Sequence, residues 1–231
     1  MPLEESLETP GAQTRVFLQP IAAPSILGMF GLAGSTFMMA ALLCRWFGSI
    51  ATTLAIVPFA ALFGGLAQFL AGMWAFKARD GVATAIHGMW GAFWIAFGYL
   101  AFFAAAGRVP PPAGPLYPAF GYWFIVLAAV TWACSIASAA ENKCMMLTLM
   151  WLAAGSTVFA IGLLAGSYGL MLASGYIFLV SSFIAWYTAS ALMINEAFGR
   201  EVWSLGRSTQ ARQMPRVSVG IGEPGVIRGQ A

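Results

Sequence analysis

Two polar side chains with useful chemistry lie inside long apolar stretches of this sequence, Gln68 and His87. The Gln68 amide can donate and accept hydrogen bonds, and the His87 imidazole can gain or release a proton near neutral pH. A polar group in an apolar environment is costly unless it is paired, so both should face a protein interior. Two interpretations of each remain open. Gln68 forms an interhelical hydrogen bond or donates to a carboxylate, and His87 is a proton relay or a solvent-reaching side chain near a helix end.

Hydroxyl groups occur in pairs within two other apolar stretches, Ser35 with Thr36 and Ser156 with Thr157. They can donate hydrogen bonds to a carboxylate. In apolar helices such hydroxyls more commonly bond back to the carbonyl one turn earlier.

The elements that position these side chains are six apolar stretches, each long enough to cross a membrane. A helix needs about 20 apolar residues to cross the hydrocarbon layer, and backbone in lipid must satisfy its own hydrogen bonds by forming a helix. The sequence therefore predicts an all-α integral membrane protein, a bundle of six transmembrane helices. The predicted spans are residues 24–44, 51–76, 82–106, 119–140, 144–166 and 169–195.

Basic residues predict the orientation of this bundle. Of the 11 Lys and Arg residues, all except Arg45 and Arg108 fall on one side of the predicted membrane. Because Lys and Arg accumulate in cytoplasmic loops, we expect both termini in the cytoplasm of a multi-pass protein of the plasma, or inner, membrane. The predicted organisation is a mobile polar tail over 1–21, the helical domain over 22–199 and a basic mobile tail over 200–231.

Composition argues against several classes of protein. Only 8% of the residues are charged, far too few to cover a water-facing surface. The basic residues adjoin the spans and form no stripe suited to nucleic acid. Cys44, Cys134 and Cys144 lack metal-ligand spacing. The spans hold no paired carboxylates or Cys–His pair, so we expect no enzyme activity, metal or cofactor.

Three motifs, in order along the chain, resemble a known family. Residues 63–72 read FGGLAQFLAG, residues 91–94 read GAFW, and residues 195–202 read NEAFGREV. They resemble the signatures of the acetate uptake transporters, or succinate–acetate permeases, in the second, third and sixth helices. The resemblance extends over residues 20–206.

The resemblance implies a six-helix protomer that assembles into a hexamer, with a path for acetate, other small monocarboxylates and sometimes succinate, moved with protons. It also places Asn195, Glu196 and Arg200 in a helix-end motif. For these residues we expect a bundle-stabilising role, with a cytoplasmic gate or attraction of anions as the alternative.

The sequence also departs from the family pattern. Residues 23–29 read APSILGM, without the asparagine and second proline of the family's first helix, and the family usually has no histidine at position 87. The family's hydrophobic constriction aligns with Leu32, Trp90 and Leu152, of which Leu152 matches by residue type and the others by position.

These residues predict an apolar pathway for a small carboxylic acid, lined by Leu32, Ser35, Thr36, Gln68, Trp90, Leu152 and Thr157. A bare carboxylate is costly to desolvate, whereas the protonated acid crosses more easily, so proton-linked movement is expected. The expected partners are the acid, protons, membrane lipid and further copies of the chain. The open alternatives are a channel for ammonia or urea and a membrane sensor that transports nothing.

Overall fold

The computed structural model describes residues 21–47, 50–108 and 116–207. The described part is helical, and six of its helical rods are long and apolar enough to span a membrane, which confirms the predicted six-helix bundle. The helical elements are α1 (Pro24–Leu43), α2 (Ile50–Phe59), η1 (Ala60–Ala67), α3 (Gln68–Ala78), α4 (Gly81–Ala105), α5 (Leu116–Ser138), α6 (Lys143–Ala165) and α7 (Tyr168–Phe198). The predicted tails, apart from residue 21 and residues 200–207, lie outside the described residues.

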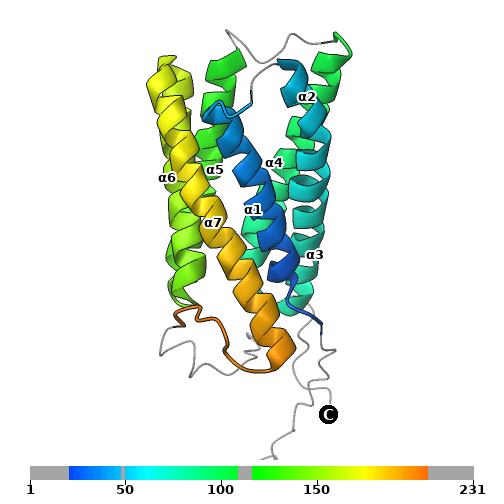
Figure 1. The fold of residues 1–231 in the computed structure, drawn as a ribbon, viewed down its shortest axis with the longest axis vertical. Coiled ribbons are helices and arrows are strands. Elements are labelled where there is room, and N and C mark those ends of the chain that lie inside the picture. Colours follow the sequence, from blue (N-terminus) through cyan, green and yellow to red (C-terminus); the bar gives the residue numbers. More distant parts are fainter. Residues whose placement is uncertain (1–20, 48–49, 109–115, 208–231) are drawn as a thin grey trace, which may run out of the picture.

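The rods run side by side along the long axis of the molecule (Figure 1). Helix α1 packs against α7 on one side and against η1, α3 and α4 on the other, and α5 and α6 complete the bundle. The start of α1, the α3–α4 and α5–α6 turns and the end of α7 share one end of the bundle, the lower end in Figure 1. An even number of spans places both described chain ends there.

The second span differs from a uniform α-helix. Pro58 lies inside α2 and lacks the N–H that an α-helix needs at that position, and a wider π-helical segment, η1, begins two residues later. The segment contains Gly64 and Gly65, which pack against Ser35 of α1 and Ile95 of α4. Short π-helical segments often occur at functional sites, and this one includes the first five residues of the 63–72 motif.

Glycine brings α3 and α4 into backbone contact. A Cβ atom added to Gly72 would lie 2.7 Å from the backbone nitrogen of Gly88, and one added to Gly91 would lie 2.5 Å from that of Phe69. These positions leave no room for any side chain, so the two helices approach as closely as their backbones permit. The contact fixes the depth of the residues beside it, which include Gln68, next to Phe69, and His87, next to Gly88.

Side chains and glycines end the helices near the shared end of the bundle. Asp80 caps α4 by accepting from the Ala83 amide at 2.8 Å. Asn142 caps α6 by accepting from the Met145 amide at 2.8 Å. Gly199 ends α7 in the left-handed conformation, with φ of 63°.

Candidate functional site

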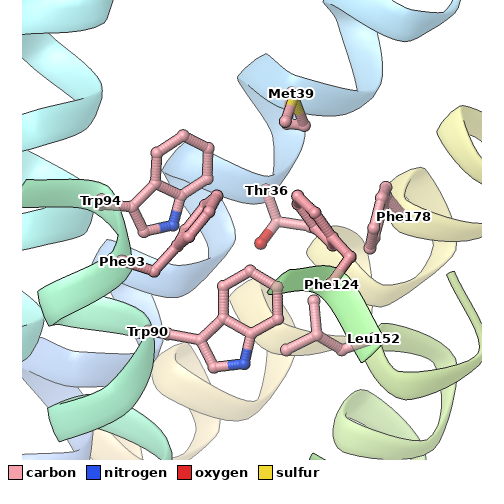
Figure 2. Close-up of a pocket in the computed structure, with 8 residues that line it drawn as sticks. All are labelled: Thr36, Met39, Trp90, Phe93, Trp94, Phe124, Leu152 and Phe178. Carbon is pink, nitrogen blue, oxygen red and sulfur yellow. The ribbon is translucent and has the colours of Figure 1, made fainter. Parts of the chain in front are cut away.

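A narrow cavity lies among α1, α4, α5, α6 and α7 in the middle of the bundle (Figure 2). Its volume is about 10 Å³, near the lower limit for holding one water molecule. Acetate, with four non-hydrogen atoms, does not fit without side-chain movement. The lining residues are Thr36, Met39, Trp90, Phe93, Trp94, Phe124, Leu152 and Phe178.

Aromatic rings close this cavity by packing edge to face. The centroid of the Phe93 ring lies 5.6 Å from that of Trp90, 5.4 Å from Trp94 and 5.3 Å from Phe124. Edge-to-face contacts at these distances are favourable in addition to the burial of the rings. The structure therefore presents a closed constriction, and passage of a solute requires at least one ring to rotate.

Trp90 is held in place by a hydrogen bond between helices. Its Nε1 donates to the Thr131 hydroxyl at 3.0 Å, and that hydroxyl donates to the Leu127 carbonyl at 2.6 Å. Both residues are buried. Because the indole N–H donates to Thr131 of α5, Trp90 contributes no free hydrogen-bond donor to the cavity, which it lines beside Leu152 (Figure 2).

The structure brings together three of the predicted pathway residues and separates the others from the cavity. Trp90, Leu152 and Thr36 line it. Leu32 lies one turn before Thr36 on α1, fully buried in the same core but outside the lining. Leu32 stays outside the lining because the rise of one helical turn separates it from Thr36.

The two remaining predicted hydroxyls face elsewhere. Ser35 donates to the Gly31 carbonyl at 2.8 Å and packs against Gly64 of η1. Thr157 donates to the Ala153 carbonyl and accepts from Trp132 Nε1 at 3.2 Å, in a partly exposed contact between α6 and α5. Helical geometry explains why Ser35 points away from the cavity. Adjacent residues of a helix point about 100° apart, and on α1 it is Thr36 that points toward the cavity.

Gln68 and His87 are fully buried, with 0% exposure each. His87 does not reach solvent, so that interpretation of it was wrong. Gln68 does not form the interhelical hydrogen bond either. Among the described residues, the buried side-chain polar atoms without a hydrogen-bond partner are Thr36 Oγ1, both amide atoms of Gln68, both ring nitrogens of His87 and Trp94 Nε1.

These unpartnered groups are concentrated in one region. Thr36 and Trp94 line the cavity, Gln68 faces Gly31 of α1, and the His87 ring lies against Gly28. Buried polar groups in native proteins are nearly always hydrogen-bonded, and exceptions often mark functional positions. The hydroxyl, amide and indole groups could hydrogen-bond to a carboxylic acid or to water, and the imidazole could also bind a proton in transit.

The helix-end motif lies at the shared end of the bundle. The Asn195 side chain accepts from the backbone amides of Val202 at 2.7 Å and Trp203 at 2.9 Å, and donates to the Trp203 carbonyl at 2.8 Å. These bonds fold the segment after α7 back onto the helix. Glu196 and Arg200 are exposed.

Sequence reasoning missed five lining residues, Met39, Phe93, Trp94, Phe124 and Phe178. Phe93 and Trp94 belong to the GAFW motif, so that motif was an available signal. Phe124 and Phe178 stand among many aromatic residues of their spans, and nothing in the sequence distinguishes them.

Two carboxyl groups lie near each other at the shared end of the bundle. Asp80 follows α3, and Glu141 lies in the α5–α6 turn. Burial, and secondarily the negative charge of Asp80, raise the pKa of Glu141 from 4.5 to about 7. Glu141 therefore holds its proton well above the pH at which a free glutamate loses it.

This shift predicts that acidification stabilises the protein. Between pH 4.5 and about 7 the folded chain keeps the Glu141 proton whereas the unfolded chain releases it, so stability falls as pH rises through this window. Partial solvent exposure reduces the expected change to about 1 kcal/mol. In Glu141→Gln, the thermal midpoint measured in detergent should change less with pH over this window. Glu196→Gln, at an exposed carboxyl, should leave the pH dependence of the midpoint intact. An unchanged slope in Glu141→Gln would contradict the assignment.

The described residues contain no group of three His, Cys, Asp or Glu side chains that could hold a metal ion. Cys44, Cys134 and Cys144 are free thiols.

Comparison with known proteins places this arrangement among membrane transporters and channels. The sequence profile described as the GPR1/FUN34/yaaH family matches residues 7–200. The ammonia transport outward protein 2 of Saccharomyces cerevisiae is 27% identical over 172 residues, covering 74% of this chain and 61% of the yeast protein. The chain thus spans less than two thirds of that relative.

A bacterial relative is covered almost completely. The succinate-acetate/proton symporter SatP of Escherichia coli is 25% identical over 189 residues, covering 81% of this chain and 97% of SatP. A solved structure of the bacterial acetate channel SatP superposes with a TM-score of 0.73 at 22% identity, over 81% of this chain and 100% of that one. At this identity the superposition shows a shared fold.

Proposed function

Because the chain belongs to the GPR1/FUN34/yaaH family, we propose that it moves acetate and related small carboxylates, with succinate as a further candidate, across the membrane together with protons. The observation that carries this proposal is the apolar constriction next to a few unpartnered polar groups. Thr36 Oγ1 and Trp94 Nε1 belong to residues that line the cavity, and neither atom has a hydrogen-bond partner.

These features suit an acid that passes in its neutral form. Among the described residues, no Lys or Arg lines the cavity, and full desolvation of an isolated carboxylate is prohibitive in a low-dielectric interior. A protonated acid needs little more than one or two hydrogen-bond partners, which Thr36 and Trp94 offer. The bacterial relative named a succinate-acetate/proton symporter supports the same substrate class and the link to protons.

The experiment is uptake of labelled acetate into proteoliposomes that contain the purified full chain. Protein-free vesicles of the same lipid provide the background, because neutral acetic acid also crosses lipid. We expect initial uptake above this background, faster with an inward proton gradient and suppressed by unlabelled acetate. Uptake equal to the background, from protein shown to be folded, would reject the proposal and leave another small solute or a non-transporting sensor as the alternatives.

Ammonia is the second candidate substrate, because a yeast relative is named an ammonia transport outward protein. A neutral molecule with one non-hydrogen atom is also closer in size to the closed cavity than acetate is. The same vesicles separate the two: ammonia entry raises the internal pH, and acetate entry with a proton lowers it. A saturable rise of the internal pH when ammonium salts are added, together with no change of internal pH when acetate is added, would favour ammonia as the substrate.

The assembly and setting follow the same proposal. We place the protein in the plasma membrane as a hexamer, with both termini in the cytoplasm and no catalytic activity. Basic residues near the shared end of the bundle, such as Lys77, Arg79 and Lys143, support the orientation.

An apolar groove of about 590 Å³ on the outer face of η1 and α4 offers a surface for a neighbouring copy. Native mass spectrometry in detergent measures the number of copies.

A further inference from the structure

One face of α1 carries small residues that lie against polar groups at successive depths. The Ser25 hydroxyl donates to Asp80 Oδ2 at 3.4 Å. One turn deeper, Gly28 lies against the His87 ring, and at the next turn Gly31 lies against the Gln68 side chain. A helix rises about 1.5 Å per residue, so each step along α1 is about 4.5 Å.

The second wall of this series is α4. His87 and Trp94 are spaced seven residues apart on α4, so they share one face of that helix, and Asp80 caps its first turn. Helical side chains lean toward the N-terminus, which is the end of α4 that Asp80 caps. At the inner end, Trp94 and Thr36 line the cavity. The polar groups thus extend from the shared end of the bundle to the constriction.

Packing leaves room for the imidazole but gives it no partner. A Cβ atom at Gly28 would clash with the His87 ring, so glycine is required for the ring to occupy this place. Both ring nitrogens and both amide atoms of Gln68 lack hydrogen bonds while being fully buried. An unsatisfied buried polar group destabilises the fold, and an apolar residue at the same position would avoid this cost. The positions therefore serve something other than stability.

We infer that Asp80 and His87, with Gln68 as a positioning residue, form the proton path of this protein between the end of the bundle and the constriction. A proton that arrives from the Asp80 side binds one ring nitrogen of His87 and forms the imidazolium. The proton on the other ring nitrogen then leaves toward the carboxylate of the acid, so only N–H and O–H bonds change. The Gln68 amide holds no extra proton, and it orients the imidazole or the acid by hydrogen bonding. This inference rests on the proposed function.

The charged groups around the path are concentrated at its outer end. Asp80 and Glu141 are the carboxyl groups of the two turns there, and Lys77 and Arg79 end α3. Helix α1, over its whole length, has no ionisable residue. Beyond Asp80, His87 is the first ionisable side chain on α4 in the direction of the cavity.

The test measures protons and acid in the same vesicles. Proteoliposomes of the full chain contain a pH-sensitive dye, take up labelled acetate, and are clamped at zero membrane potential with valinomycin and potassium. After subtraction of protein-free vesicles, the wild-type chain should take up about one proton per acetate. At neutral pH, His87→Gln should lower acetate uptake and proton uptake together by about tenfold or more, because the bare anion does not pass. At acidic pH, where the acid arrives already protonated, uptake by this variant should return toward the wild-type rate.

Two further variants keep the test independent of how well His87→Gln folds. Asp80→Asn removes the carboxylate but keeps a good helix N-cap, and Gly28→Ala displaces the imidazole without removing it. Both should lower uptake at neutral pH and recover at acidic pH. Gly121→Ala is the matched control, because its Cβ would lie 2.8 Å from the Leu164 side chain at the distant α5–α6 contact, and it should leave uptake unchanged at both pH values.

The outcomes separate the two proposals. Absence of protein-dependent acetate uptake in the wild type rejects the proposed function itself, and the proton path with it. Normal wild-type uptake, together with unchanged uptake at neutral pH in folded His87→Gln and Asp80→Asn, overturns the proton path alone. A loss of uptake in these variants that is equal at neutral and acidic pH also overturns it, since that result indicates a purely structural role.

Discussion

Leu152→Ala is expected to widen the range of acids that the protein accepts. Leu152 is fully buried and lines the narrow cavity opposite Trp90 (Figure 2). Truncation removes three carbon atoms from the lining and so enlarges a cavity that is near the size of one water molecule. A longer acid then needs less movement of the surrounding rings to pass. Uptake of labelled butyrate relative to acetate should rise by about tenfold, within the range found when a pocket changes by one or two methylene groups.

Leu149→Ala is the matched control for this variant. Leu149 lies on α6 one turn earlier, is equally buried and does not line the cavity. Both truncations should lower stability by about 2–5 kcal/mol, and only Leu152→Ala should change the butyrate-to-acetate ratio. Equal ratios in the two variants would show that the acid does not pass through this cavity.

Gly91→Ala is expected to have the largest effect on stability. Its Cβ would lie 2.5 Å from the Phe69 backbone nitrogen, 2.8 Å from the Phe69 Cα and 3.0 Å from the Gly65 carbonyl oxygen. Backbone atoms cannot rotate away as a side chain can, so α4 must shift away from η1 and α3. A cost of about 3 kcal/mol or more follows, measured as a lower thermal midpoint in detergent by tryptophan fluorescence.

Gly88→Ala tests whether this effect comes from contact or from helix propensity. Gly88 lies three residues earlier on α4, and a Cβ there meets nothing within 4 Å. Alanine favours a helix over glycine by about 0.5–1 kcal/mol, so Gly88→Ala should raise the midpoint or leave it unchanged. A similar loss in both variants would count against close packing of α4 on α3.

The sequence alone determined the number of spans and the family. Bilayer thickness sets the length of a spanning helix, and lipid excludes both charge and unpaired backbone. Six apolar stretches, with charge in four of the five gaps between them, therefore allow one architecture. The three motifs at residues 63–72, 91–94 and 195–202 predicted the family. Like the spans, each motif is a local residue pattern, which can be identified without knowing which helices meet.

Only the tertiary structure decided which polar groups come together and how the path is closed. Every span is apolar on all sides, so its sequence does not show which face points inward, and Thr36 faces the cavity where its neighbour Ser35 does not. His87 lay near a predicted helix end, yet Gly28 admits its ring into the bundle and removes it from solvent. The ring cluster around Phe93 and Phe124 joins residues of α4 and α5. Such contacts depend on the rotation and depth of each helix, which packing at glycines fixes and local sequence does not encode.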